Sequence, residues 1–344
     1  MKYRLYTTSE TAWDAMLEAI DQASKSIYME MYIFANDTVL SHDFIGKLKQ
    51  KAAEGVSVVI VADAFGSSAL RKEAAGIIKQ SSIELIFFSH WLRHIHRKIL
   101  IVDEKTAFIG GVNIGKSYRY WNDLQLRLSG KIIRTLLKSF AYTYAMSGGK
   151  NRKILNYREI KYSGKLKHWF LEHWPIKNIY TLKSLYVEKI NQARKSIQIV
   201  TPYFTPPRWL ISVLDNAVRR NVAVEILLPR KTDFPLLDRL NYRYAYEVHP
   251  LGAKFFLTKT MNHAKLLVID GEEGLIGSQN IDLLSFKINT EAGIFFKERK
   301  LLKEISAVIE SWKKDSVEFE LEQYKMKFID YIILALMKIF RPIL

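Results

Sequence analysis

Two short blocks of the sequence carry residue types that can do chemistry on a phosphate ester. The first reads HRKILIVD from His96, and the second reads HAKLLVID from His263. Each places a histidine and a lysine two residues apart at the start of an apolar run typical of a β-strand. Side chains at i and i+2 of a strand point to one face, so we expect His96 to project with Lys98, and His263 with Lys265.

The two blocks belong to an internal duplication. Five residue types recur at a constant spacing of 167, and two further segments match at spacings of 170 and 166, ASKSI from Ala23 with ARKSI from Ala193, and GVSVVIV from Gly55 with NVAVEIL from Asn221. Self-similarity at a fixed period indicates repeated structural units. The five pairs are His96 and His263, Lys98 and Lys265, Asp103 and Asp270, Gly110 and Gly277, and Asn113 and Asn280.

Two histidines, two lysines and two asparagines suit the cleavage of a phosphodiester. The lysines supply positive charge, and the amides of Asn113 and Asn280 donate to the non-bridging oxygens as charge develops. One histidine can attack phosphorus and form a phosphohistidine. The other can protonate the leaving oxygen and later deprotonate the acceptor hydroxyl. The symmetry of the repeat leaves open which histidine does which.

A nucleophilic histidine must be neutral and held in one tautomer, and a carboxylate on its other nitrogen does this. Two acidic residues stand at matching distances from the motifs. Asp123 lies 27 residues after His96, and Glu291 lies 28 residues after His263. We predict that these two carboxylates orient the catalytic histidines.

The remaining repeated residues are expected to support the backbone. Gly110 and Gly277 follow a second short strand and allow close backbone approach, whereas Asp103 and Asp270 end their strands and cap the following turns. His94 with His96 is the alternative reading of the first block as a metal pair, but no acidic or cysteine cluster accompanies it. We therefore predict no metal site and no cofactor.

The pattern around the motifs indicates an α/β fold. Helical patterns at 44–53 and 210–220 alternate with strand-like runs, so each half should form a mixed β-sheet flanked by helices. We expect two pseudo-symmetric repeats with one shared active site at their interface. The predicted divisions are a first repeat at 1–146, a basic connecting segment at 147–177, a second repeat at 178–320 and a C-terminal helix at 321–344. The alternative for the connecting segment is a merely solvated surface.

The composition points to a polyanionic partner. The 344 residues contain 52 Lys plus Arg and 35 Asp plus Glu, a net charge of +17, which favours nucleic acid or an anionic membrane. Cysteine is absent, which excludes thiol catalysis and disulfides. No stretch approaches the roughly 20 apolar residues of a spanning helix.

The C-terminal segment reads FIDYIILALMKIFRPIL and differs from the rest of the chain. On a helix it places charged residues on one stripe and apolar residues, including Ile332, Leu336 and Phe340, over the remainder. This arrangement is typical of a helix that lies in a membrane interface. The alternative is a terminal helix docked on the protein's own core.

HRKILIVD and HAKLLVID resemble the paired HKD motifs of the phospholipase D superfamily, and the resemblance covers nearly all of residues 1–320. TPYFTPP from Thr201 and EGVSVVIVADAFGS from Glu54 are similar to segments of bacterial cardiolipin synthases. Since the sequence starts at the catalytic core, where the long class begins with membrane-spanning helices, we expect the resemblance to be closest to the short class of these proteins. The sequence departs from the family at Ile95, where an asparagine is common, and this departure bears on the preference for the acceptor or the leaving group.

The resemblance implies two phospholipase D-like repeats and metal-independent transfer of a phosphatidyl group onto phosphatidylglycerol through a phosphohistidine. It also implies His96 as nucleophile and His263 as general acid and base. The alternatives are a lipid hydrolase of the phospholipase D type, in which water takes the place of the acceptor, a nuclease or phosphodiesterase of the same superfamily, and a membrane scaffold with a dead site. The intact motifs speak against the scaffold, and the cardiolipin synthase-like segments speak against nucleic acid as substrate.

The resemblance and the charge together imply a peripheral enzyme on the cytoplasmic face of a bacterial cell membrane. Its partners would be an anionic phospholipid membrane and phospholipid substrates, and one chain already holds both half-sites, so we expect an active monomer. Trp91 and Leu92 precede the first motif. They either contact lipid beside the active site or pack in the core.

Overall fold

The computed structural model describes residues 2–160 and 170–321, and these divide into two compact units. The first unit comprises Met1–Ile179 together with Ile276–Gln279 and Ile288–Phe296. The second comprises Tyr180–Leu275, Asn280–Lys287 and Lys297–Leu344. Mixed sheets flanked by helices confirm the predicted fold class. The linear domain boundaries stay predictions.

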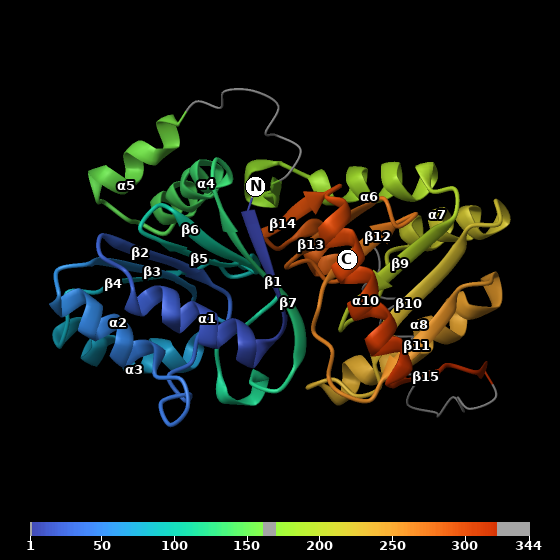
Figure 1. The fold of residues 1–344 in the computed structure, drawn as a ribbon, viewed down its shortest axis with the longest axis horizontal. Helices are drawn as coiled ribbons and strands as arrows, with labels where there is room; N and C mark the ends of the chain where they lie inside the picture. The colour runs from blue at the N-terminus through green and yellow to red at the C-terminus, as the bar shows by residue number, and fades with distance from the viewer. Residues whose placement is uncertain (1, 161–169, 322–344) are drawn as a thin grey trace. The chain divides into compact units, whose positions relative to one another are not determined.

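In the first unit a seven-stranded sheet has the order β1-β7-β6-β5-β2-β3-β4. Figure 1 shows α1, α2 and α3 along one face of this sheet and α4 along the other. The elements are β1 (Lys2–Thr8), α1 (Ser9–Asp21), β2 (Ser26–Met31), α2 (Phe44–Ala53), β3 (Ser57–Asp63), α3 (Ser68–Lys79), β4 (Glu84–Phe88), β5 (Lys98–Val102), β6 (Thr106–Gly110), β7 (Asn122–Ser129), α4 (Ile132–Met146), α5 (Arg152–Asn156), β8 (Phe170–His173) and β14 (Glu291–Phe296).

The strand directions decide which loops meet at one edge of this sheet. Strands β2, β3 and β4 run parallel, whereas β5 runs antiparallel to β2 with Met31 opposite Lys98. The carboxyl ends of the three parallel strands therefore lie at the same edge as the start of β5, where the first HKD motif begins. Every residue of β2 and of β5 is buried, because helices cover both faces.

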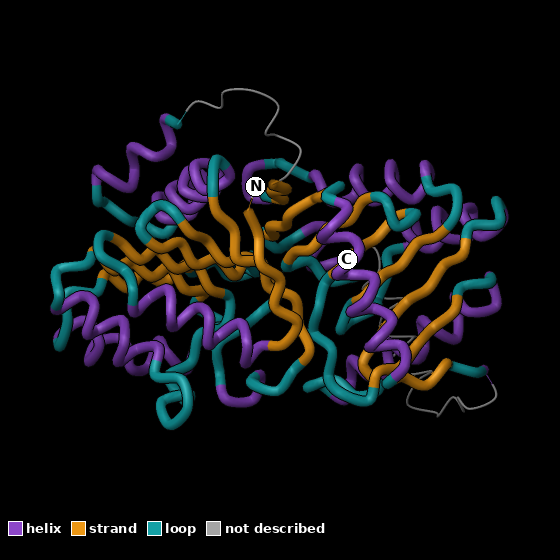
Figure 2. The backbone as a smooth tube through the Cα atoms, viewed as in Figure 1, coloured by secondary structure: helices purple, strands orange, loops and turns teal. Residues whose placement is uncertain are grey.

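The second unit repeats this plan. Its strands β15, β11, β10, β9 and β12 lie in that order, with β9, β10 and β11 parallel and β12 antiparallel to β9. Figure 2 shows these strands side by side with helices against them. The elements are α6 (Thr181–Gln192), β9 (Ser196–Val200), α7 (Arg208–Arg219), β10 (Ala223–Pro229), α8 (Pro235–Val248), β11 (Lys254–Thr258), β12 (Leu266–Ile269), β13 (Glu273–Gly277), α9 (Leu283–Lys287), α10 (Arg299–Lys314) and β15 (Ser316–Glu318).

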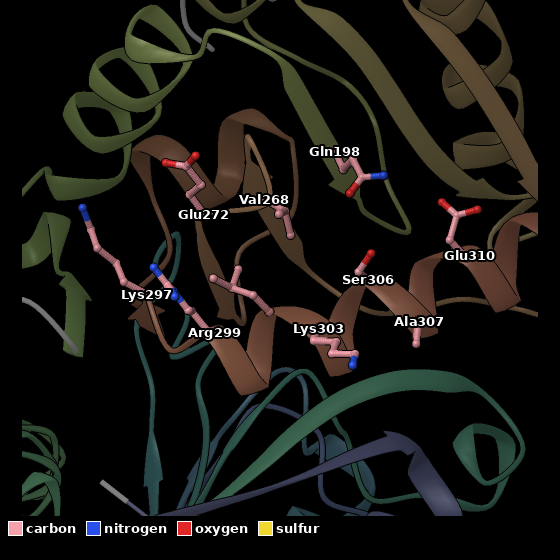
Figure 3. A pocket seen from close by; sticks show the side chains of 11 residues that line it. Gln198, Val268, Glu272, Lys297, Arg299, Lys303, Ser306, Ala307 and Glu310 are labelled. Carbon is pink, nitrogen blue, oxygen red and sulfur yellow. The ribbon is translucent and has the colours of Figure 1, made fainter.

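The two repeats differ in how β2 and its counterpart β9 pack against a helix, α4 (Ile132–Met146) in the first repeat and α10 (Arg299–Lys314) in the second. In the first, Tyr28 of β2 is fully buried and stacks on Phe140 of α4, with ring centroids 5.3 Å apart. In the second, Gln198 of β9 stands at the matching position. A pocket of about 900 Å³ opens there between β9, β12 and α10. Figure 3 shows Gln198 and Ser306 pointing toward one another across it. The smaller polar side chain thus leaves space that the aromatic pair fills in the first repeat.

A buried ion pair lies behind the first motif, on the opposite strand face from Lys98. Arg97 is fully buried, with its Nε 3.2 Å from Oε1 of Glu30 and its guanidinium 5.5 Å from the Trp174 ring centroid. Burial raises the pKa of Glu30 to about 7, against the lowering effects of Arg97 and of a hydrogen bond from Thr143. Desolvation therefore outweighs the charge pairing at this carboxyl.

This raised pKa predicts a pH-dependent stability. Below pH 4.5 Glu30 is protonated in both the folded and the unfolded chain. Between pH 4.5 and about 7 only the unfolded chain loses the proton, so the free energy of unfolding falls as pH rises, by roughly 3 kcal/mol in total. In Glu30→Gln this decline should disappear. Urea midpoints measured at pH 5 and pH 8 would test it, with the exposed Glu18→Gln as control. An equal decline in Glu30→Gln and in the wild type would contradict the assignment.

Candidate active site

The first HKD motif places its histidine and lysine next to one another in the first unit. His96 precedes β5 and is 6% exposed, and Lys98 opens the strand and is fully buried. The Lys98 Nζ donates a 2.6 Å hydrogen bond to the carbonyl of His96. The ring of Tyr32 packs against both, with its centroid 4.6 Å from that of His96 and 5.1 Å from the Lys98 Nζ. The imidazole and the ammonium thus share one enclosed, aromatic-walled position.

Glu291 on β14 is the carboxylate that meets His96. Its Oε1 and Oε2 both lie 3.0 Å from the His96 Nδ1. The Thr290 carbonyl accepts the His96 backbone N–H at 2.9 Å, so the chain beside Glu291 also fixes the histidine backbone. Glu291 is fully buried, and the Ser278 hydroxyl donates to its Oε2.

The charge on Glu291 is maintained by its neighbours. Burial by itself would raise the pKa of this carboxyl, but His96, through charge and a hydrogen bond, then Lys98 and Ser278, lower the pKa below its ordinary value. An ionised Glu291 that accepts from Nδ1–H leaves the His96 Nε2 as the unprotonated nitrogen when the ring is neutral. That is the tautomer required of a nucleophile.

The second motif shows the same local arrangement in the second unit. His263 precedes β12 and is 4% exposed, and the Lys265 Nζ donates a 2.5 Å hydrogen bond to the carbonyl of His263. The Tyr203 ring stands edge-on to the imidazole, with centroids 6.4 Å apart. Asn262 holds the turn into the strand, because its Oδ1 accepts the Ala264 N–H at 3.1 Å.

The two repeated asparagines carry buried side-chain oxygens without a hydrogen-bond partner in the described part of the chain. Asn113 and Asn280 are 2% and 5% exposed. Each backbone is fixed, because the Asn113 carbonyl accepts the Trp13 indole N–H and the Asn280 N–H donates to the Ser285 hydroxyl. A buried polar atom without a partner costs about 1–3 kcal/mol. Such atoms are typical of a site that a ligand completes.

The repeated aspartates bind backbone rather than facing the histidines. The carboxylate of Asp103 accepts the backbone N–H groups of residues 24–26, and that of Asp270 accepts those of residues 194–196. Both stand in the left-handed region, with φ of 52° and 55°. Burial is the largest single effect and raises their pKa values, but the backbone donors together outweigh it and lower the pKa of each carboxyl below its ordinary value. These contacts support the structural role predicted for both.

Both repeated glycines lie where a side chain would strike the neighbouring strand. A Cβ on Gly110 would come within 2.1 Å of the Leu124 carbonyl oxygen, and one on Gly277 within 2.7 Å of the Ala292 carbonyl oxygen.

Asp123, the other predicted orienting carboxylate, is 1% exposed on β7. Its Oδ1 accepts the Leu124 N–H at 2.7 Å, beside Gly111.

His94, the other histidine of the first block, contacts Asp63 at the end of β3. Its Nδ1 lies 3.3 Å from Oδ1 of Asp63, whose other oxygen accepts the Ile95 N–H at 2.9 Å. Among residues 2–160 and 170–321, no group of three His, Cys, Asp or Glu side chains could hold a metal ion.

Trp91 is 85% exposed and Leu92 is 52% exposed, so the packed-core reading of this pair is wrong. The predicted C-terminal helix, with Ile332, Leu336 and Phe340, lies outside the described residues. Within the described residues, no helix has the length and hydropathy needed to cross a bilayer.

The contacts above agree with a comparison against known families. The model of the cardiolipin synthase PLD-like domain matches the chain twice, at residues 16–142 and 186–312. The chain belongs to this family. Each match of the cardiolipin synthase PLD-like domain contains one HKD motif, and the paired matches confirm the duplication seen in the sequence.

Curated relatives carry the same family name. The cardiolipin synthase of Listeria welshimeri is 30% identical over 322 residues, which cover 88% of this chain and 66% of that protein. The minor cardiolipin synthase ClsB of Bacillus subtilis is 29% identical over 331 residues, covering 91% of this chain and 82% of the relative. The chain thus spans about two thirds of the length of the Listeria protein.

A solved structure supports the fold. The phosphatidylserine synthase of Haemophilus influenzae Rd KW20 superposes with a TM-score of 0.74 at 16% identity, over 99% of this chain and 93% of that one. At this identity the similarity establishes the shared fold alone.

Sequence reasoning did not find Ser278, Thr290 or Tyr32. A signal for Ser278 was available, because it stands between Gly277 and Asn280 where the first repeat has Gly111. No such signal marks Thr290 or Tyr32, whose contacts with His96 depend on how distant segments pack.

Proposed function

We propose that this protein is a cardiolipin synthase-like phosphatidyltransferase that moves a phosphatidyl group from one phospholipid to the hydroxyl of phosphatidylglycerol. The observation that carries the proposal is the enclosed His96, held by an ionised Glu291 with Lys98 beside it. The second intact motif and the cardiolipin synthase relatives give the substrate class.

In the proposed first step the Nε2 of His96 attacks the phosphorus of the donor lipid. The bond to the leaving alcohol breaks, and His263 supplies the proton to its oxygen. In the second step His263 takes the proton from the acceptor hydroxyl, which attacks the same phosphorus and releases His96. Lys98, Lys265 and the amides of Asn113 and Asn280 stabilise the charge on the non-bridging oxygens in both steps.

The alternatives within the superfamily are a lipid hydrolase, in which water accepts the phosphatidyl group, and a nuclease. We favour lipid over nucleic acid because the relatives named above are lipid enzymes and because large apolar side chains such as Trp91 are exposed near the first motif. We place the protein on the cytoplasmic face of a bacterial membrane, acting as a monomer.

The substrate class is tested by offering both kinds of phosphodiester. Purified protein should release glycerol from phosphatidylglycerol in mixed micelles and leave single- and double-stranded DNA intact. Cleavage of DNA at a comparable rate, with no glycerol release, would assign the site to a nuclease.

Removal of divalent ions should not change turnover, because every charge in the proposed steps is met by a lysine, an amide or a histidine. Protein dialysed against EDTA is expected to release glycerol at the rate of the untreated protein. Loss of activity that Mg²⁺, Ca²⁺ or Zn²⁺ restores would contradict the proposed chemistry.

A further inference from the structure

The exposed apolar side chains of the first unit are concentrated in a few loops. Among its described residues, eight large apolar side chains are exposed, and six of them lie in four loops that follow β2, β3, β4 and β6. We call these six the apolar rim. They are Val39, Leu40, Phe65, Trp91, Leu92 and Tyr120, whereas the other two, Ile78 and Ile179, lie outside these loops.

Strand direction places all four loops at the edge of the sheet where His96 lies. Strands β2, β3 and β4 end at this edge because they are parallel, and β5 starts there because it is antiparallel to β2. Strand β6 returns to the same edge, with Ile109 opposite Ile99. A direct contact supports the placement, because the ring of Phe65 lies 5.2 Å from that of His94, two residues before His96.

The rim is too apolar and too exposed for an ordinary solvated loop surface. Leu40 is fully exposed, Trp91 is 85% exposed and Phe65 is 71% exposed. Large exposed apolar side chains gathered in the loops at one edge of a sheet mark an interaction surface. Tryptophan, with an apolar ring and one N–H donor, is enriched at the boundary between lipid and water.

The second unit shows the same feature at its own motif. Phe234 and Leu236 are 58% and 55% exposed and follow β10, whose carboxyl end lies at the edge where β12 and His263 begin. The exposed cations Arg230 and Lys231 directly precede them. Cations next to apolar side chains suit a surface of anionic phospholipid.

We infer that the apolar rim enters the interfacial layer of an anionic phospholipid bilayer and holds the catalytic edge of the first unit against the lipid headgroups. The inference rests on the proposed function for its substrate but not for the contact itself. It assigns membrane binding to folded loops around the motif, in addition to any contribution from the C-terminal segment.

The test compares a rim variant with a control at an exposed apolar residue outside the rim. The double variant Phe65→Ser, Trp91→Ser should sediment with vesicles of phosphatidylglycerol and phosphatidylcholine at least about tenfold more weakly than the wild type. Ile78→Ser on α3, where the native side chain is 47% exposed, should bind as the wild type does. Trp91→Phe keeps an apolar ring and should restore binding relative to Trp91→Ser. In the second unit, Phe234→Ser should weaken binding and Val317→Ser on β15 should not.

Depth is measured by quenching with brominated lipids. Brominated lipids should quench a smaller fraction of the tryptophan fluorescence in Trp91→Phe than in the wild type, because the indole that enters the lipid is gone. The other tryptophans still supply a signal to measure. Unchanged vesicle binding in the rim variants, or equal losses in Ile78→Ser, would overturn the inference. So would a wild-type dimer that the rim variants convert to a monomer without affecting vesicle binding.

The outcome can be separated from that of the proposed function. Turnover of a short-chain phosphatidylglycerol, dissolved below its micelle concentration, needs no membrane contact, so the rim variants should retain the wild-type rate on it. If the wild type binds vesicles through the rim but turns over no lipid, the surface stands and the proposed function fails. If lipid turns over and the rim variants bind normally, the proposed function stands and the surface fails.

Discussion

His96→Ala is expected to reduce glycerol release from phosphatidylglycerol by at least about 10⁴-fold, with the protein still folded. The variant removes the nucleophile and therefore the covalent step, for which the water-mediated alternative is far slower. The exposed His90→Ala is the matched control and should keep the wild-type rate. Activity of His96→Ala within tenfold of the wild type would exclude His96 as the nucleophile.

The same experiment with a different donor separates the roles of the two histidines. A p-nitrophenyl ester of phosphatidic acid has a leaving group that needs no proton. His263→Ala should therefore release one equivalent of p-nitrophenol in a burst and then stall, because no base activates the acceptor. His96→Ala should show no burst. A burst in His96→Ala alone would reverse the roles.

Glu291→Gln is expected to lower kcat by about 10²–10⁴-fold with little change in KM. The amide keeps the shape of the carboxylate but removes the negative charge that fixes the His96 tautomer and stabilises its cation. Steady-state kinetics on phosphatidylglycerol give the split between kcat and KM. Glu298→Gln, exposed and near in sequence, is the control.

Ser278→Ala distinguishes positioning from a general packing role. It removes one hydrogen bond to Glu291 while leaving the carboxylate in place, so it should cost roughly tenfold in kcat.

For Glu291 itself, a Glu291→Gln variant with wild-type kcat, or one whose whole loss is in KM, would contradict the assignment of Glu291 to His96.

The repeat spacing was enough to predict the architecture of each half. The β-branched runs around residues 57–63 and 223–229 form β3 and β10, and the helical pattern at 44–53 is α2. The two-residue period of a strand also predicted that the side chains of His96 and Lys98 lie together, and the Tyr32 ring packs against both.

The partner of each carboxylate could not be read from spacing. Asp123 and Glu291 stand at nearly equal distances from the histidines that precede them in their repeats, yet Glu291 contacts the histidine of the other repeat. The pairing of Glu291 with His96 depends on β14 packing in the first unit, a long-range contact that leaves no local pattern. The burial of Arg97 was not predicted either. An arginine between a histidine and a lysine gives no local sign of burial, and its ion pair with Glu30 is a long-range contact.

The fate of the phosphatidyl group tests the central proposal most directly. Phosphatidylglycerol would be incubated with the protein in H₂¹⁸O and the lipids resolved by mass spectrometry. The account predicts cardiolipin and free glycerol in equal amounts, without ¹⁸O in the cardiolipin and with no cardiolipin in His96→Ala. Phosphatidic acid that carries ¹⁸O, with no cardiolipin even at high phosphatidylglycerol, would show that water is the acceptor and would contradict phosphatidyl transfer.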